Sequence, residues 1–465
     1  MLNYSFFSAT PHFLLNQILT FFVPLLPITI QELRKMDQQI TSRERFRAVF
    51  EHNTAGLDRL PMLSLGTPNQ GLFYQEWEKT VAEEIPDEMV RLTFFGDKTM
   101  NKWLNSEWHN HGLGWGNGYP DVPYTDEREW SRFSPEERPN IRMNIGWNGA
   151  INAHGQKMHG VDYSWYVNGY FTRQKTVDGD ILEPWQVREQ FYAEHGEPWD
   201  DKFAPVEASR KEFQREHQWY EEHYNDFSES GFADFALMNS AGGIFEGTWE
   251  GMGSGTPGMS IMCRKYPGKL RDWLRQVTDF VMKSVKLQFE LAQEVGAQLD
   301  FIWLWDDSGQ KGRSLISPEY HREFWMPFYK EICDYVHQQN AFVIIHGCGF
   351  CEELLPNWIE AGIDAWQTIE RAALNDPARI RENFGNKIIL IGAVDASNVV
   401  SFAQTTGEVD AHVKQTMQDA VYATDDACYI PGFTHDLLDC PLQNVRTAVD
   451  AMLKYGQLDA LKQMK

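Results

Sequence analysis

The chain has 465 residues, 42% hydrophobic and 14% aromatic, which supplies a large core and excludes disordered and fibrous proteins. Its formal net charge of −24 repels nucleic acid phosphates and anionic lipid, so we expect a small-molecule substrate, no nucleic acid and no stable membrane association. Six cysteines in so long a chain do not form a disulfide framework and indicate a reducing, cytoplasmic compartment. A homo-oligomer is left open.

The first 35 residues differ from the rest. An apolar run extends over Phe13–Ile30, but polar residues and prolines interrupt it, and no basic residue precedes it. It therefore matches neither a signal peptide nor a spanning helix, which needs about 20 clean apolar residues. We expect residues 1–35 to be an extension outside the fold and residues 36–465 to form one domain. A membrane-associating segment and a docked arm are the alternatives.

The next elements can be taken in chain order. Thr41 to Glu44 spells a capping box before a helix that ends near His52, and Met62–Leu65 is an apolar run typical of a buried strand. Residues 72–230 are rich in Trp, Tyr, His and charge, and an alternating stretch at Gly160–Gln174 indicates a hairpin. We interpret 72–230 as early elements of the domain that carry long inserted loops.

After about residue 232, apolar strands alternate with amphipathic helices. The predicted strands are Phe235–Met238, Phe301–Trp305, Ala341–Ile345, Asp364–Ile369, Lys387–Ile391 and Cys428–Ile430. The predicted helices are Lys269–Gln298, one begun by Ser317-Pro318, Glu352–Ala361, Gly407–Tyr422 and Leu442–Tyr455. This alternation predicts a parallel sheet buried on both faces. No glycine fingerprint for dinucleotides follows a strand, so we favour a (β/α)8 TIM barrel with long insertions in its N-terminal half over an open sheet.

Polar residues follow these strands and would meet at the mouth of the barrel. His346 and Cys348 stand two apart at a strand end, so both side chains point to one side, as a pair of zinc ligands requires. The third ligand would be His435, Cys351 or Cys440. Ordinary packing of a hydrogen-bonded histidine is the alternative to metal binding, and a redox pair of Cys348 and Cys351 is a lesser one.

Four acidic residues also end strands. Asp306 and Asp307 follow one apolar run, and a general acid or base or a substrate anchor would sit there, with a helix-capping or turn pair as the alternative. Asp395 has the same two interpretations. Glu370 is similar, but for it a salt bridge with a neighbouring arginine, Arg371 or Arg379, is the stronger alternative.

Several of these motifs, in this order and spacing, resemble the uroporphyrinogen decarboxylase superfamily, which includes the corrinoid-dependent methyltransferases. The resemblance runs from about Leu299 to Tyr455 and more loosely over Thr41–Pro61. The matching pieces are Trp305-Asp-Asp-Ser-Gly, Ile316-Ser-Pro-Glu-Tyr, His346-Gly-Cys-Gly, Ile359-Glu-Ala-Gly-Ile-Asp, Ile391-Gly-Ala-Val-Asp395, Pro431-Gly-Phe-Thr-His435 and Pro441-Leu-Gln-Asn444.

The resemblance implies a TIM barrel and bears on the chemistry. In the methyltransferase branch a His-x-Cys at this place binds zinc with a further cysteine from the last strand end, and the zinc holds a thiol that accepts a methyl group from a corrinoid. Here Phe433 or His435 stands where that branch has cysteine. The decarboxylase branch carries an Arg-Gln-Ala-Gly-Arg pattern on its first strand, whereas this chain has Met62-Leu-Ser-Leu-Gly there and no arginine.

We therefore expect an enzyme for zinc-assisted methyl transfer between a corrinoid, held by a partner protein, and a small thiol. The expected Zn²⁺ ligands are His346, Cys348 and His435. Asp307, Asp395 and His435 are the expected catalytic residues, and the expected substrate contacts are Asp306 and Glu370. The alternatives are a carboxy-lyase of the decarboxylase type without metal and a non-catalytic barrel that binds a corrinoid or another small ligand.

Overall fold

The computed structural model describes residues 40–63, 108–110, 236–252, 255–294, 298–421, 427–435, 437 and 439–464, with short pieces between 166 and 193. The expectations for residues 1–35, and most of those for 72–230, lie outside the described residues. Within the expected hairpin at Gly160–Gln174, strand β2 (Tyr166–Val167) pairs antiparallel with β3 (Tyr170–Phe171), so that prediction is confirmed.

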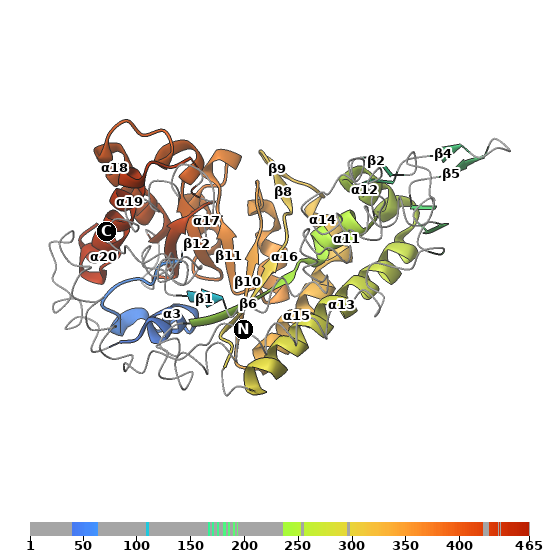
Figure 1. Cartoon of the computed structure of the whole chain (residues 1–465), viewed down its shortest axis with the longest axis horizontal. Helices are drawn as coiled ribbons and strands as arrows, with labels where there is room; N and C mark the ends of the chain where they lie inside the picture. Colours follow the sequence, from blue (N-terminus) through green and yellow to red (C-terminus); the bar gives the residue numbers. More distant parts are fainter. Residues whose placement is uncertain are drawn as a thin grey trace, which may run out of the picture.

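One sheet organises the molecule, and its seven strands all run parallel (Figure 1). Because buried parallel strands need near-continuous apolar runs, they coincide with the apolar segments of the sequence. In spatial order the strands are β1 (Trp108–Asn110), β6 (Ala236–Gly242), β7 (Phe301–Trp305), β10 (Phe342–His346), β11 (Ala365–Thr368), β12 (Ile389–Val394) and β13 (Tyr429–Phe433).

The free edge of β13 is covered by residues 60–63. The backbone N–H of Leu63 donates to the carbonyl oxygen of Pro431 at 3.1 Å. A Cβ on Gly432 would lie 1.8 Å from the Leu63 carbonyl oxygen, so only glycine allows this approach. The segment thus supplies an eighth strand position beside the seven named strands. The curled parallel sheet confirms the predicted (β/α)8 class, and the segment contains the start of the predicted strand Met62–Leu65.

Apart from α3, whose residues join the core inside the barrel, the helices pack outside the sheet. In Figure 1, α13 and α15 lie to one side of the strands and α17 to α20 to the other. The helices described are α3 (Ser42–Phe50), α11 (Ile244–Met252), α12 (Gly255–Lys265), α13 (Pro267–Glu294), α14 (Pro318–Phe324), α15 (Met326–Gln338), α16 (Leu355–Ala361), α17 (Pro377–Phe384), α18 (Thr406–Val421), α19 (Leu442–Tyr455) and α20 (Leu458–Met464). The capping box of Thr41 and Glu44 is present, and Gly362 ends α16 in the left-handed conformation, as the sequence predicts.

Alternate residues of each strand face two separate cores. Phe301, Trp303 and Ile344 point into the barrel, where α3 also packs, while Ile302 and Leu304 join the core between sheet and helices. The barrel interior is therefore filled by side chains below its mouth, and only the last residues of the strands can form a site.

The predicted strand ends fall short on β12 and β13. Gly392 and Pro431-Gly432 look like turn signals in the sequence, yet β12 continues two residues past Gly392 and β13 one residue past Gly432. Gly392 (φ +99°) and Ala393 (φ +69°) adopt positive φ within β12, and burial between neighbouring strands holds them there.

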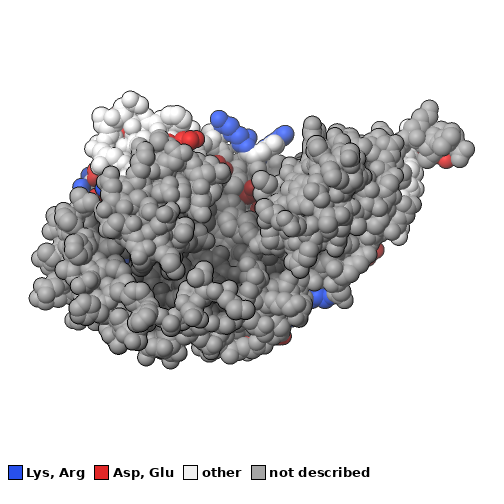
Figure 2. Space-filling model, in the orientation of Figure 1, with Lys and Arg blue, Asp and Glu red and all other residues white. Residues whose placement is uncertain are grey.

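The composition predicts free cysteines and no membrane-spanning helix. All six cysteines are free, as the composition predicts. Among the described helices, none has the length and apolar character needed to cross a membrane. On the face in Figure 2, basic side chains protrude at the upper edge close to acidic ones, so the described surface there is of mixed charge.

Candidate active site

Polar side chains gather at the carboxyl ends of β7, β10, β11 and β13. The register places His346, the last residue of β10, between Trp305 of β7 and Gln367 of β11. The ring centroid of Trp305 lies 4.7 Å from that of His346. His346 is thus fixed in the top layer of the barrel.

The tautomer of His346 follows from its hydrogen bonds. Gln367 donates its amide N–H to the carbonyl oxygen of Thr434 at 3.2 Å, which turns the amide oxygen of Gln367 toward Nδ1 of His346. An amide oxygen only accepts, so Nδ1 carries the proton and Nε2 keeps its lone pair. Burial lowers the pKa of His346 despite the opposing charge of Asp307, so the ring is neutral. A neutral imidazole with a free Nε2 is the form that binds metals.

That free nitrogen faces the thiol of Cys348. Nε2 of His346 lies 3.2 Å from Sγ of Cys348, which confirms the side-by-side placement predicted from the spacing of the two residues. Burial raises the pKa of the Cys348 thiol far above its usual value, and the negative charges of Asp307 and Glu370 raise it further. Without a cation nearby, Cys348 is therefore a thiol that donates to His346.

The loop that carries Cys348 is held by a close backbone crossing. The hairpin of β8 (Gly309–Gln310) and β9 (Arg313–Ser314) lies against it, and the N–H of Phe350 donates to the carbonyl oxygen of Gln310 at 2.9 Å. A Cβ on Gly309 would lie 2.6 Å from the Cys348 carbonyl oxygen. A Cβ on Gly349 (φ +78°) would lie 2.3 Å from the carbonyl carbon of Gly309. Both glycines are required for the approach.

Asp307 and Glu370 both accept hydrogen bonds from the backbone of the loop that carries Cys348. Asp307 Oδ1 accepts the backbone N–H of Cys348 at 2.8 Å and lies 3.5 Å from Nε2 of His346. Glu370 accepts the backbone N–H of Gly349 and pairs with Nε2 of His435 at 2.8 Å. The side chains of Asp307, Glu370 and His435 are 40%, 21% and 29% exposed, so all three can be reached from solvent.

The salt-bridge interpretation of Glu370 is wrong. Arg371 pairs with Asp419 at 2.6 Å, and Arg379 pairs with Glu352 at 2.6 Å. Both arginines therefore point away from Glu370, whose pKa is lowered chiefly by the hydrogen bond from His435.

The predicted zinc ligands His346, Cys348 and His435 fall into two groups that share the sulfur of Cys348, and each group adds a carboxylate that was not predicted as a ligand. Ligand atoms of Asp307, His346 and Cys348 lie within 4.8 Å of one another, and so do those of Cys348, Glu370 and His435. Nitrogen, sulfur and carboxylate oxygen are the donors that Zn²⁺ takes in proteins. The donor set therefore fits a zinc site, although His346 and His435 belong to different groups.

Asp306 points away from these groups. It is fully buried, and its carboxylate accepts the N–H groups of Phe245 (3.2 Å) and Glu246 (2.7 Å) in the first turn of α11 and the hydroxyl of Tyr329. Burial raises the pKa of Asp306 to about 7. The contacts are those of the helix-cap alternative.

Asp395 also caps a turn. Its carboxylate accepts the N–H of Asn398 at 2.9 Å at the start of a π-helical turn, Ala396–Val400, and its own N–H donates to Nε2 of His412. It belongs to neither group of ligand atoms, so its expected role in proton transfer stays a prediction.

The alternative third ligands lie elsewhere. Cys351 is buried, and its sulfur contacts the carbonyl oxygens of Gly347 and Cys348. Cys440 is buried against Ser401, 3.2 Å from its hydroxyl. Phe433 lies in the core. Among the described residues, His435 is the only one of the three predicted third ligands that belongs to a group of ligand atoms with Cys348.

Sequence reasoning missed Gln367 and Glu246. Gln367 orients His346, and a glutamine within the apolar run Ala-Trp-Gln-Thr-Ile was the available signal, because a polar residue there must find a buried partner. Glu246 contacts the backbone N–H of Asp307 at 3.4 Å from the first turn of α11. No pattern in the sequence indicated that contact.

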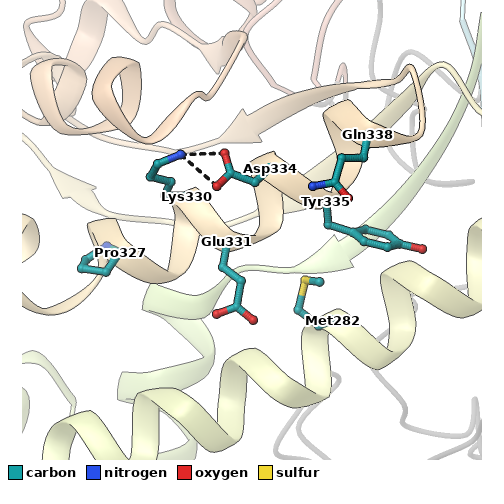
Figure 3. Close-up of a pocket in the computed structure, with 7 residues that line it drawn as sticks. All are labelled: Met282, Pro327, Lys330, Glu331, Asp334, Tyr335 and Gln338. Carbon is teal, nitrogen blue, oxygen red and sulfur yellow. Dashed lines mark hydrogen bonds and ion pairs between the residues drawn. The ribbon is translucent and has the colours of Figure 1, made fainter.

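A surface groove between α13 and α15 lies apart from these residues (Figure 3). Its charges are paired, because Lys330 binds Asp334 one turn along α15 and Glu331 binds Arg275 of α13. None of the ligand atoms described above lines it, so it does not compete with the barrel mouth as a candidate active site.

The comparisons with known proteins concern the part of the chain that carries the candidate site. The uroporphyrinogen decarboxylase (URO-D) family model matches residues 244–455. A solved methyltransferase from Methanosarcina mazei is similar in structure with a TM-score of 0.51 at 13% identity, over 90% of this chain and 99% of that chain, which shows a shared fold. A B12-independent methionine synthase from Shewanella sp. W3-18-1, in complex with selenomethionine, aligns at a TM-score of 0.32 and 13% identity, over 50% and 63% of the chains, too low to support an argument. No curated protein matches the sequence.

Proposed function

We propose that this chain, whose residues 244–455 match the uroporphyrinogen decarboxylase (URO-D) family model, is an enzyme that transfers a methyl group from a corrinoid to a small thiol with the help of Zn²⁺. The observation that carries the proposal is the approach of His346 Nε2 to Cys348 Sγ at 3.2 Å at the barrel mouth, beside further carboxylate and imidazole ligands. The corrinoid would be presented by a partner protein.

The zinc would be held by His346, Cys348 and Asp307, whose ligand atoms form one group, while His435, the third ligand expected from the sequence, lies in the other group. When bound, Zn²⁺ would lower the pKa of an acceptor thiol, so that the thiolate, which is the strong nucleophile, is present at neutral pH. The hydrogen bond from His346 Nδ1 to Gln367 keeps Nε2 available as a ligand. Trp305 packs against the ring and keeps water from that side.

Transfer of the methyl group also requires a residue that takes the proton of the acceptor thiol. The acceptor sulfur gains a methyl group and loses its proton, while the electron pair of the broken bond stays with the donor. His435 can take that proton, because Glu370 at 2.8 Å stabilises the imidazolium that forms. Asp306 and Asp395 act at a distance in this proposal, by fixing the helix and the turn that follow their strands.

A second candidate is a carboxy-lyase that needs no metal, and the observation that favours it is the pair of Glu370 and His435. A histidine beside a carboxylate could protonate the carbon from which carboxylate leaves. The nearest charges at the described part of the mouth are those of Asp307 and Glu370, which would repel a substrate with many carboxylates. The methyltransferase is therefore the better supported proposal.

Spectroscopy with free methylcobalamin tests the proposal. Purified protein loaded with Zn²⁺ is mixed anaerobically with methylcobalamin and 2-mercaptoethanol, and demethylation is followed by absorbance and the methyl thioether by mass spectrometry. We expect catalysis that stops on chelation and returns with Zn²⁺. Substitution Cys348→Ser should reduce the rate at least about 100-fold, because a ligand is lost.

The matched control is Cys351→Ser, which changes a thiol three residues away that belongs to neither group of ligand atoms. It should keep most of the activity. Protein that binds no transition metal, or demethylation that chelation leaves unchanged, would contradict the proposal. Metal-independent release of carbon dioxide from a carboxylated substrate would favour the lyase.

A further inference from the structure

The two groups of ligand atoms have the same composition. Asp307 and His346 give the first group one carboxylate oxygen and one imidazole nitrogen. Glu370 and His435 give the second group the same two donors. The sulfur of Cys348 belongs to both groups.

The structural origins of the two groups are independent. Asp307 follows β7 and His346 ends β10, whereas Glu370 follows β11 and His435 follows β13. Cys348 lies on the loop after β10, between them. Backbone hydrogen bonds of this loop to both carboxylates, from Cys348 to Asp307 and from Gly349 to Glu370, hold each carboxylate beside the sulfur.

We infer that the barrel mouth binds two divalent cations, with the sulfur of Cys348 as the bridging ligand, the first cation held by Asp307 and His346 and the second by Glu370 and His435. The inference rests on the metal site of the proposed function and adds a second ion to it. His435 is then a ligand, and the acceptor thiol gives its proton to solvent instead. Zinc, or another divalent metal that accepts mixed nitrogen, oxygen and sulfur donors, is the chemical class.

Charge supports two ions over one. Asp307, Glu370 and a Cys348 thiolate carry three negative charges, and the described pairing of Arg371 and Arg379 leaves neither arginine to neutralise Glu370. With the acceptor also bound as a thiolate, one dication would leave two uncompensated negative charges in a half-buried position, whereas two dications would make the site neutral. Each ion would still have positions for exogenous ligands, as catalytic metal sites do.

The competing interpretation is one ion beside an acid–base pair. In that case only Asp307, His346 and Cys348 bind metal, while Glu370 and His435 remain hydrogen-bonded to each other. The two interpretations differ in metal stoichiometry, which can be measured without any methyl donor or acceptor.

Cobalt is the probe, because a thiolate bound to Co²⁺ gives a charge-transfer band. The full-length protein is stripped with a chelator and titrated with CoCl₂, by calorimetry and by absorbance. We expect saturation at two equivalents per chain, with the charge-transfer band still rising during the second. Saturation at one equivalent, or no binding, overturns the inference.

Variants that lack the carboxylate and the histidine of one group, called half-site variants, show which residues bind each ion. Substitutions Asp307→Asn with His346→Gln should leave one equivalent bound through Glu370 and His435, and Glu370→Gln with His435→Gln should leave one on the other side. The charge-transfer band should persist in both and disappear in Cys348→Ser, while Cys351→Ser should still bind two. Circular dichroism checks that each variant is folded.

The wild-type stoichiometry decides the inference even where a variant fails to fold. If the wild type binds a single ion and still demethylates methylcobalamin, the proposed function stands and the second ion does not exist. If it binds no metal, both fail. A half-site variant that loses both ions also overturns the assignment, because each group should bind independently of the other's terminal ligands.

Discussion

Acidic side chains have different partners at the two ends of the barrel. At the amino end, Asp300 is fully buried and its carboxylate contacts the guanidinium groups of Arg43 (3.0 Å) and Arg47 (2.8 Å) and the N–H of Leu237. At the carboxyl end, the carboxylates contact backbone N–H groups and imidazoles instead. A guanidinium is a permanent cation, whereas an imidazole near neutral pH is not.

Each end also has a histidine beside a cysteine. His52 Nδ1 lies 3.1 Å from Cys428 Sγ at the amino end, almost the same separation as between His346 and Cys348. The described ligand groups include the second pair and not the first. A His–Cys contact therefore becomes a candidate metal site only where carboxylates without a permanent cation surround it.

The largest expected effect compares Asp300→Asn with Asp307→Asn. Asp300→Asn removes the charge from a buried ion pair and should lower the free energy of unfolding by about 3 kcal/mol. Asp307 is half-exposed, so Asp307→Asn should change stability by less than about 1 kcal/mol but weaken metal binding about tenfold or more. Denaturant titrations and Co²⁺ titrations of both variants measure the contrast.

This comparison fails if either substitution has the effect expected of the other. If Asp300→Asn weakens Co²⁺ binding as much as Asp307→Asn does, the amino end is not separate from the metal chemistry. Equal losses of stability in the two variants would equally contradict the division of roles.

Gln367 offers the next test, through the orientation of His346. Substitution Gln367→Met removes the acceptor for Nδ1–H at similar volume, so Co²⁺ affinity should fall by about 10–100-fold. Gln367→Glu retains an oxygen acceptor and should recover most of the affinity. If Gln367→Met and the wild type bind Co²⁺ equally, the amide does not orient the ligand.

A smaller effect is expected when the charge of the acceptor thiol is varied. With one zinc ion bound, Asp307, Glu370 and the Cys348 thiolate leave the mouth with a net negative charge, so cysteamine should react faster than 2-mercaptoethanol and 3-mercaptopropionate more slowly, after correction for thiolate fraction. With two ions bound, this order should disappear. The extremes should differ by roughly tenfold, about 1.4 kcal/mol, and the difference should shrink in high salt. Values of kcat/KM for the three thiols measure it. Faster reaction of the anionic thiol would show that cations outside the described residues dominate the mouth.

The smallest effect concerns pH at the amino end. The hydrogen bond from His337 to Asp364, 2.8 Å long, raises the pKa of the histidine in the folded state. The folded protein therefore binds this proton more tightly than the unfolded chain. The stabilisation is complete below the ordinary histidine pKa and disappears as pH rises through the higher folded-state pKa.

Because the pair is partly exposed, its contribution should stay below about 1 kcal/mol. Denaturation midpoints of the wild type and His337→Gln should differ at about pH 5.5 and agree at about pH 8.5. A difference that grows with pH would reverse the assigned sign.

The sequence predicted the fold where one interaction dominates. Phe301–Trp305 and Leu442–Tyr455 have the bounds predicted from their apolar patterns, because hydrophobic burial alone specifies them. The same reasoning ended β12 and β13 too early, because glycines inside a buried strand look like turn residues. Local signals mislead when neighbouring strands hold the backbone.

Most residues of the candidate site were predictable from the sequence, but the contacts between them were not. The placement of His346 and Cys348 followed from their spacing, but the partner of Glu370 depends on where β13 delivers His435, more than sixty residues later. Likewise, only the register between β10 and β11 brings Gln367 to His346. Contacts of this kind depend on tertiary structure, which spacing along one strand cannot supply.

The interlocked glycines at 309 and 349 set a limit on how the mouth can be remodelled. Since the hairpin after β7 and the loop after β10 cross without room for a Cβ on either, they must be redesigned together or left alone. Loop grafting or random mutagenesis for new substrates would then be directed at other strand ends. Libraries that vary one of these two loops should be dominated by misassembled barrels, and libraries that exchange both as one cassette should not.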